Sequence, residues 1–326
     1  MHHPTRRSAL TGLAALTAVT LAAWAPAGHA SDYPNKPIEL IVPVAPGGGT
    51  DIVGRAFAEA AKKYLPQQPV IVTNKPGASG AVGMGELINA KPDGYKIGII
   101  IVELTIIPNL GVVKFTAADL RPVARLNVDP AAITVRADAP WKTVEEFMAD
   151  ARARKEPLAV GNAGMGSIWH MAAAAFSDKT GIPVNHVPFL GASPAVVALL
   201  GGHVDAVTVS PGEVAQHVAA GKLRTLAVMA DQRVGGVFEN APTLKERGVD
   251  VSVAVWRGLA VPKTTPQPVV DILADVAKKV GDDAGFRETL ARANLGFAYA
   301  DAAAFQLVID RDRAFYKELV PKLAMK

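Results

Sequence analysis

Apolar runs alternate with segments of helical periodicity along most of the chain. The run IELIVPV (38–44) is rich in β-branched residues without a break, as expected of a strand that is covered on both faces. Residues at helical spacing follow it, with one face formed by Ile52, Ala56, Phe57, Ala60 and Tyr64. Further strands are expected at 69–74, 96–102, 157–162, 204–210 and 223–230, and helices at 168–179 and 211–220. Strand, loop and helix repeated in this order predict an α/β fold with largely parallel sheets.

The helix expected at 211–220 carries its own start and stop signals. Ser210 and Glu213 form a capping box around Pro211 at the first helical position, and Gly221 closes the helix. The chain has 326 residues, which exceeds what one core usually holds, so two domains are expected. No low-complexity linker separates the halves, which suggests that the chain crosses between the domains more than once.

The first 30 residues have the pattern of an export signal. Arg6 and Arg7 precede a stretch without charge that runs to Asp32, and Gly28 and Ala30 fit a signal-peptidase site before Ser31. A membrane anchor is the alternative, but the Ala- and Thr-rich composition gives it weak lipid affinity. The string TRRSAL also resembles a twin-arginine signal, except that position 9 is Ala, so the export route stays open. Either route predicts a periplasmic protein.

Charge and cysteine content exclude several functions. The chain has 34 basic and 30 acidic residues, and the two arginines of the leader leave 32 against 30 in the remainder. No clustered basic excess is visible, so nucleic acid is not an expected partner. The absence of cysteine excludes disulfides, thiolate metal sites, a cysteine nucleophile and a lipid-anchored N-terminal cysteine.

Four glycine-rich turns follow predicted strands and carry the candidate chemistry, at 46–51, 77–80, 162–167 and 189–194. Such loops lie at the carboxyl ends of strands, where ligands bind in open α/β sheets. Glycines free N–H groups to face a ligand, and the helix starts add partial positive charge. Gly48, in the middle of the first run, is expected to adopt a positive φ and to let a ligand oxygen approach the backbone. No Arg or Lys occurs in these turns, so N–H groups are expected to hold an anion.

Enzyme and metal motifs are incomplete. Phosphate-loop and dinucleotide patterns lack required glycines, and the GASPA segment at 191–195 lacks the last glycine of a nucleophile elbow. The histidines at 170, 186, 203 and 217 form no pair at metal-ligand spacing, so no metal or other cofactor is expected. His170 lies one turn beyond Ser167 and is a candidate hydrogen-bonding residue. No catalytic residue is predicted.

Several blocks of the sequence resemble one known family. YPNKPIELIVPVAPGGGTDIVGR (33–55) is similar to the N-terminal signature of the Bug family, the periplasmic solute-binding receptors of tripartite tricarboxylate transporters. NKPGASGAVG (74–83), GMGSIWH (164–170) and VPFLGASPAVVALLGGHVD (187–205) match later blocks in order. The resemblance covers nearly the whole mature chain. It implies a two-domain Venus flytrap of type II that holds a small carboxylate through main-chain amides.

Transferred by motif, the resemblance assigns ligand binding to loop residues of both halves. They are Gly47, Gly48, Gly49, Thr50, Asp51, Ser79, Ser167, Phe189, Gly191 and Ser210. Glu103 departs from the family pattern, since small polar residues are commoner after the third strand. If Glu103 faces the cleft, it disfavours a plain dicarboxylate and favours a ligand with an amino or ring-nitrogen group. The alternative places it in solvent or in an ion pair at the hinge.

The resulting hypothesis is a periplasmic binding protein without catalysis. Residues 1–30 are the signal peptide, 31–121 with 230–326 form one domain, and 122–229 form the other. Strands near 121–126 and 226–230 would join them, and closure would bury the ligand and present a form that a membrane permease recognises. A periplasmic hydrolase or isomerase that uses the same cleft, and a ligand sensor with a signalling partner, are the alternatives.

Overall fold

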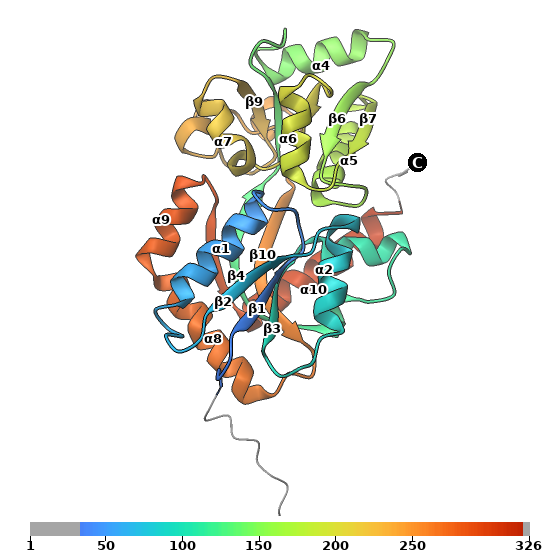
Figure 1. Ribbon diagram of the computed structural model, residues 1–326. Coiled ribbons are helices and arrows are strands. Elements are labelled where there is room, and N and C mark those ends of the chain that lie inside the picture. Colours follow the sequence, from blue (N-terminus) through green and yellow to red (C-terminus); the bar gives the residue numbers. More distant parts are fainter. Residues whose placement is uncertain (1–32, 322–326) are drawn as a thin grey trace, which may run out of the picture. The chain divides into compact units, whose positions relative to one another are not determined.

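The computed structural model describes residues 33–321, and those from Pro34 onward belong to one unit (Figure 1). The predicted signal peptide and its cleavage after Ala30 lie outside the described residues. None of the helices in the described part is both long enough and apolar enough to cross a membrane.

The first sheet of the described chain has six strands in the order β11-β4-β10-β3-β1-β2. Its members are β1 (Ile38–Val42), β2 (Val70–Asn74), β3 (Lys96–Ile101), β4 (Leu120–Pro130), β10 (Ala254–Pro262) and β11 (Phe297–Asp301). The apolar run at 38–42 is an inner strand, since β2 and β3 pair with its two edges, and four of its five residues are buried. Both faces of β1 are thus covered, as its composition predicts.

The second sheet has five strands in the order β7-β6-β8-β5-β9. They are β5 (Ala132–Arg136), β6 (Leu158–Asn162), β7 (Val184–Pro188), β8 (Ala206–Val207) and β9 (Leu223–Val228). The strand expected at 204–210 is thus only two residues long. The residue after it, Thr208, instead donates its hydroxyl to the carbonyl of Trp169 at 2.7 Å.

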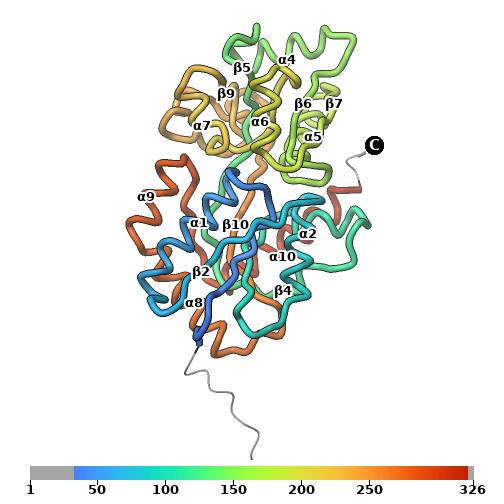
Figure 2. Tube along the Cα trace, in the orientation of Figure 1, coloured from blue at the N-terminus to red at the C-terminus, as the bar shows by residue number. Residues whose placement is uncertain are grey.

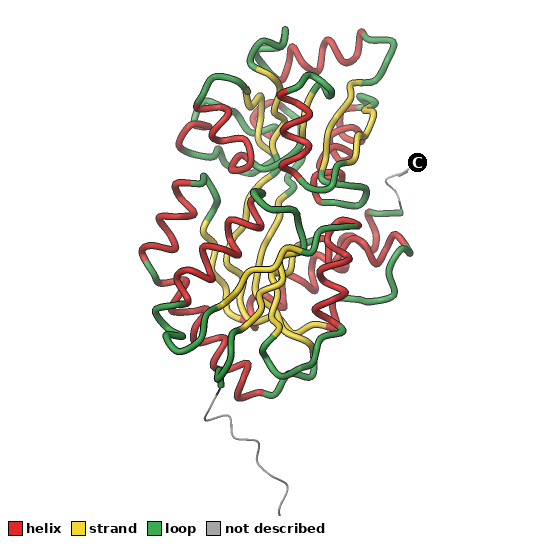
Figure 3. Tube along the Cα trace, in the orientation of Figure 1, coloured by secondary structure: helices red, strands yellow, loops and turns green. Residues whose placement is uncertain are grey.

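Helices cover the faces of both sheets (Figures 1 and 3). Those that pack with the first sheet are α1 (Gly49–Ala61), α2 (Ala81–Ile88), α3 (Glu103–Ile106), α8 (Gln267–Asp282), α9 (Ala284–Arg292) and α10 (Ala302–Leu319). Those that pack with the second are α4 (Val144–Ala153), α5 (Ile168–Thr180), α6 (Ala192–Leu200) and α7 (Pro211–Ala219). The α5 and α7 helices begin where the sequence predicts, and the capping box of α7 is present.

The α/β class is confirmed, but the sheets are mixed rather than mostly parallel. Parallel pairs join β1 to β2 and β3, and β6 to β7 and β8. The other pairs are antiparallel because the chain leaves the first sheet along β4 and returns along β10, which pairs directly with β4. In the same way it enters the second sheet along β5 and leaves along β9. Helical periodicity in the sequence reveals the helices that connect parallel strands. It gives no information about the antiparallel pairs that form where the chain returns along β9 and β10.

Two connections link the sheets. The chain passes from β4 to β5 at Ala131 and returns from β9 to β10, and the Ala131 N–H donates to the carbonyl of Val253 at 2.8 Å. Figure 2 shows the two segments side by side, green and orange. Because β4 stays in the first sheet as far as Pro130, the first connection follows 121–126 rather than lying within it. The domain boundaries at 121/122 and 229/230 remain a prediction.

Candidate functional site

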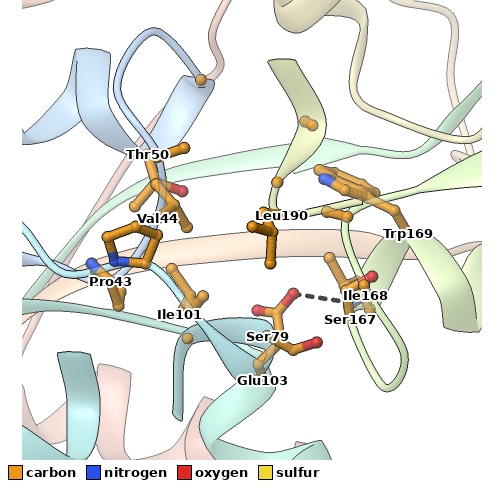
Figure 4. Close-up of a pocket in the computed structure, with 18 of the residues that line it drawn as sticks. Pro43, Val44, Thr50, Ser79, Ile101, Glu103, Ser167, Ile168, Trp169 and Leu190 are labelled. Atoms are coloured by element: carbon orange, nitrogen blue, oxygen red, sulfur yellow. Dashed lines mark hydrogen bonds between the residues drawn. The ribbon is translucent and has the colours of Figure 1, made fainter. Parts of the chain in front are cut away.

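A cavity of about 770 Å³ lies between loops that belong to the two sheets (Figure 4). Residues that follow β1, β2 and β3 of the first sheet line it, and so do residues that follow β6 and β7 of the second. Together with β8, these five strands make the parallel ladders of the described chain, so the cavity lies at the edges of the sheets where the carboxyl ends of parallel strands meet. All four glycine-rich turns contribute to it.

Apolar side chains make up most of the cavity wall. They include Pro43, Val44, Ile101, Ile107, Leu110, Ile168, Trp169, Phe189, Leu190 and Val255. The charged side chains of the lining are Glu103, Glu213 and Arg257, and its hydroxyls come from Thr50, Ser79, Ser167 and Ser193. Such a wall suits a ligand with an apolar body and few polar groups.

The first glycine turn is held by Asp51, which does not line the cavity. Its carboxylate accepts the Gly47 N–H at 2.9 Å, Arg55 Nε at 2.9 Å and Asn74 Nδ2 at 2.8 Å. Burial opposes its ionisation, but these hydrogen bonds together keep the pKa of Asp51 below its usual value. Asp51 therefore shapes the loop, and the Gly47 N–H is already used within it.

The positive φ in this turn belongs to Gly47 and not, as predicted, to Gly48. Gly47 has φ +85°, whereas Gly48 is extended with φ −82° and ψ 168°. Gly48 lines the cavity, and a Cβ there would lie 3.6 Å from Ser193 Oγ and 3.8 Å from Glu213 Oε1. The expectation was wrong because the bend occurs one residue earlier, where Gly47 folds back onto Asp51. The other part of the prediction, that a side chain at residue 48 would hinder the ligand, is consistent with the structure, since such a side chain would enter the cavity.

Gly49 is required by a buried arginine. A Cβ on Gly49 would lie 2.8 Å from Nη2 of Arg257, closer than real Cβ contacts occur. Its N–H points to Glu213 Oε1 at 3.4 Å, so neither Gly49 nor Gly47 offers its amide to the cavity. Thr50, the next residue, lines the cavity and accepts Arg257 Nε at 2.8 Å.

Arg257 is a cavity residue that the sequence prediction missed. It lies in β10 and is 1% exposed, and its guanidinium contacts Asn127 Oδ1 at 2.5 Å and an oxygen of Asp129. Glu213 Oε1 lies 3.8 Å from its Nη2. The available signal was a lone charge inside the apolar run AVWRGLAVP, because a buried strand seldom carries an unpaired arginine. Burial raises the pKa of Glu213, although Arg257 acts in the opposite direction.

Ser79 links the loops of the two sheets. Its Oγ donates to the carbonyl of Met165 at 2.6 Å, which joins the turn after β2 to the turn after β6. Ser79 has φ +54°, an uncommon conformation for a residue with a side chain. Backbone strain of this kind often accompanies ligand sites.

Glu103 makes a second link between the sheets. It is 4% exposed, lines the cavity, and accepts the N–H of Ile168 through Oε1 at 2.8 Å (dashed in Figure 4). Burial raises its pKa to about 7, although the hydrogen bond from Ile168 and the charge of Arg257 act against that rise. Glu103 therefore faces the cleft, and the alternative that places it in solvent is excluded.

His170 and Ser210 are buried but do not line the cavity. His170 Nδ1 accepts the Gly166 N–H at 3.1 Å, and its ring packs edge-on against His186 with centroids 4.4 Å apart. Burial lowers the pKa of His170 to about 4, so the ring is neutral at pH 7. Ser210 donates its N–H and hydroxyl to Glu213 Oε2 at 3.0 and 3.1 Å.

The structure thus divides the predicted site residues into two groups. Those that line the cavity are Gly48, Thr50, Ser79, Glu103, Ser167, Phe189 and Gly191. Those outside its lining are Gly47, Gly49, Asp51, His170 and Ser210, which hold the loops or their helices. In the described part of the chain no three His, Asp or Glu residues converge as metal ligands.

The two sheets and the cavity between their loops define a class, the two-domain periplasmic binding proteins. The periplasmic binding protein BugD has this fold, with a TM-score of 0.83 and 29% identity over 90% of this chain and 99% of its own. MatC from Rhodopseudomonas palustris, solved with bound malate, has a TM-score of 0.81 and 25% identity over 88% and 100%. A TctC solute-binding protein from Polaromonas, solved without ligand, is 55% identical over 89% and 99%, with a TM-score of 0.67.

Sequence relatives place the chain in a family. Residues 53–325 match the tripartite tricarboxylate transporter family receptor. A UPF0065 protein of Cupriavidus necator is 33% identical over 97% of both chains, and the protein BugT of Bordetella pertussis is 32% identical over 75% and 76%. The chain belongs to the tripartite tricarboxylate transporter receptor family, so the predicted Bug-type solute-binding receptor is confirmed. Among the similar structures, BugD is a periplasmic binding protein and the Polaromonas protein is a solute-binding protein.

Proposed function

We propose that this receptor captures a small organic acid in the cavity between its two sheets and delivers it, unchanged, to the permease subunits of a tripartite transporter. The observation that carries the proposal is the cavity itself, where the loops after β1, β2, β3, β6 and β7 form one mostly apolar wall. The malate-bound relative supports a carboxylate as the ligand class.

The ligand carboxylate is expected near the start of α1 and the turn before α6. Gly48 and Ser193 approach each other there, and Thr50 adds a hydroxyl to the lining. Helix starts favour negative charge, and hydrogen bonds from N–H and O–H groups to a carboxylate are stronger than neutral ones. Arg257 contributes positive charge behind this wall, although Asp129 already pairs with it.

Turnover of the ligand is not expected. A hydrolase would need a nucleophile that is hydrogen-bonded to a base, and Ser167 with His170 was the pair to consider. Ser167 Oγ accepts the backbone N–H of His170 at 3.1 Å, while the imidazole turns to Gly166. The side chains therefore do not form a nucleophile–base pair in this conformation.

A ligand screen on the purified protein, after removal of bound solute by unfolding and refolding, tests the proposal. Each acid is added in a thermal-shift assay, and hits are measured by calorimetric titration. A ligand at 100 times its Kd is expected to add about 2.7 kcal/mol to the free energy of unfolding. Mass spectrometry is expected to recover the ligand unchanged. A chemically converted ligand, or a panel of organic acids none of which binds, would refute the function.

A further inference from the structure

Of the two carboxylate oxygens of Glu103, one accepts a hydrogen bond and the other does not. Oε1 accepts the N–H of Ile168, whereas Oε2 is buried and has no hydrogen-bond partner among the described residues. A buried carboxylate oxygen without a donor is unfavourable, so a group that satisfies it stabilises the site. Because Glu103 lines the cavity, a bound ligand can supply that donor.

Glu103 also occupies the place where a second ligand carboxylate could bind. Ile168 is the first residue of α5, a helix of 13 residues, and its N–H is one of the donors that a helix start offers to an anion. Since Glu103 accepts this N–H, a second carboxylate that came here would meet a carboxyl group instead of a free amide.

The remaining charges of the cavity do not favour a dianion either. Arg257 is the basic side chain of the described cavity lining, and Asp129 and Glu213 already face its guanidinium. Figure 4 shows Thr50 and Glu103 at separate places on the cavity wall, and the labelled lining also includes the apolar residues Ile101 and Leu190. The carboxyl group of Glu103 thus lies apart from Thr50, which belongs to the region expected to hold the ligand carboxylate.

We propose that Glu103 is a specificity-determining residue that accepts a hydrogen bond from a nitrogen of the ligand. This receptor therefore binds an apolar carboxylate with an amino or protonated ring-nitrogen group in preference to a dicarboxylate. The inference rests on the proposed function and names the ligand class of the same site. Burial keeps part of the Glu103 population protonated near neutral pH, and a cationic nitrogen beside it favours the ionised form.

Ligands matched in length test this choice by calorimetric titration of the refolded protein. One series is 6-aminohexanoate, hexanoate and adipate, and a rigid series is 4-(aminomethyl)benzoate, 4-methylbenzoate and benzene-1,4-dicarboxylate. The amino compound of at least one series is expected to bind at least tenfold more tightly than its dicarboxylate. Because this order is measured on the unaltered protein, it does not depend on a variant that folds.

The variant Glu103→Gln replaces the free hydrogen-bond acceptor of this side chain with a donor. Glutamine keeps the acceptor for Ile168 and replaces Oε2 with an N–H donor of similar size. The amino ligand is expected to lose tenfold or more in affinity, and the dicarboxylate to gain. Glu156→Gln, which removes one exposed acid, is the matched control and is expected to change neither affinity.

The outcomes separate the two proposals. If dicarboxylates bind as tightly as their amino partners, or Glu103→Gln leaves the order unchanged, the assignment of Glu103 is overturned while the receptor for organic acids stands. If no acid of these series or of the wider panel binds, the proposed function fails and the assignment fails with it.

Discussion

Replacement of Arg257 by Met tests whether the buried charge network holds the two sheets' loops in place. The substitution keeps an unbranched side chain in β10 and removes the guanidinium that contacts Thr50, Asn127 and Asp129. Asp129 and Glu213 are 4% and 5% exposed at the side chain, so neither can recover the lost interaction from bulk water.

The magnitude follows from this burial. Removal of one partner of a buried ion pair leaves an uncompensated charge and costs about 3–5 kcal/mol. Arg257→Met is therefore expected to lower the free energy of unfolding of the ligand-free protein by that amount in urea titration. Arg233→Met is the control, because Arg233 and its partner Glu246 are 43% and 44% exposed, and such a pair contributes about 0–1 kcal/mol.

The double variant Arg257→Met with Asp129→Asn separates charge from packing. Asparagine removes the uncompensated charge, so the double variant is expected to be more stable than Arg257→Met alone by at least about 1 kcal/mol. The reasoning is refuted if Arg257→Met costs less than about 1 kcal/mol, or if the double variant is no more stable than the single one.

Three further predictions concern the ligand loop, pH and export. Gly48→Val is expected to weaken ligand binding tenfold or more, since the side chain would project toward Ser193 and Glu213. The controls Lys36→Ala and Lys75→Ala are expected to change the affinity by less than about threefold. If Gly48→Val binds the ligand normally in calorimetric titration, the assignment of this loop is contradicted. Burial raises the pKa of Glu103 from 4.5 to about 7 on folding; the charge of Arg257 opposes this rise and that of Glu213 adds to it. Between these pH values the folded state keeps a proton that the unfolded state has lost, so the free energy of unfolding falls as the pH rises. Glu103→Gln is thus expected to gain about 2–3 kcal/mol in free energy of unfolding relative to the unaltered protein between pH 5 and pH 8, and an equal pH dependence of both would argue against a buried acid. Mature protein from the native host is expected to begin at or near Ser31 and to fractionate with the periplasm, and an intact Met1 in the cytoplasm would disprove export.

Local sequence determined most of the secondary structure and the position of the loops. The apolar run at 38–42 became a buried strand, and the capping box at Ser210 started α7, because both signals depend on residues close in the chain. Strand ends followed by glycine turns also predicted where the cavity lies, since the carboxyl ends of parallel strands share one edge of a sheet.

Tertiary structure decided which side chains face the cavity and how the strands pair. The antiparallel partners β4 and β10 are more than 120 residues apart, and no local pattern reports such a pairing. Arg257 reached the cavity through that pairing, while His170, on a helix next to the predicted loop, turned toward His186 instead. The orientation of Glu103 toward α5 likewise required the two sheets to meet. Periodicity assigns a residue to a face of its own element, but only the packing of distant elements determines what that face contacts.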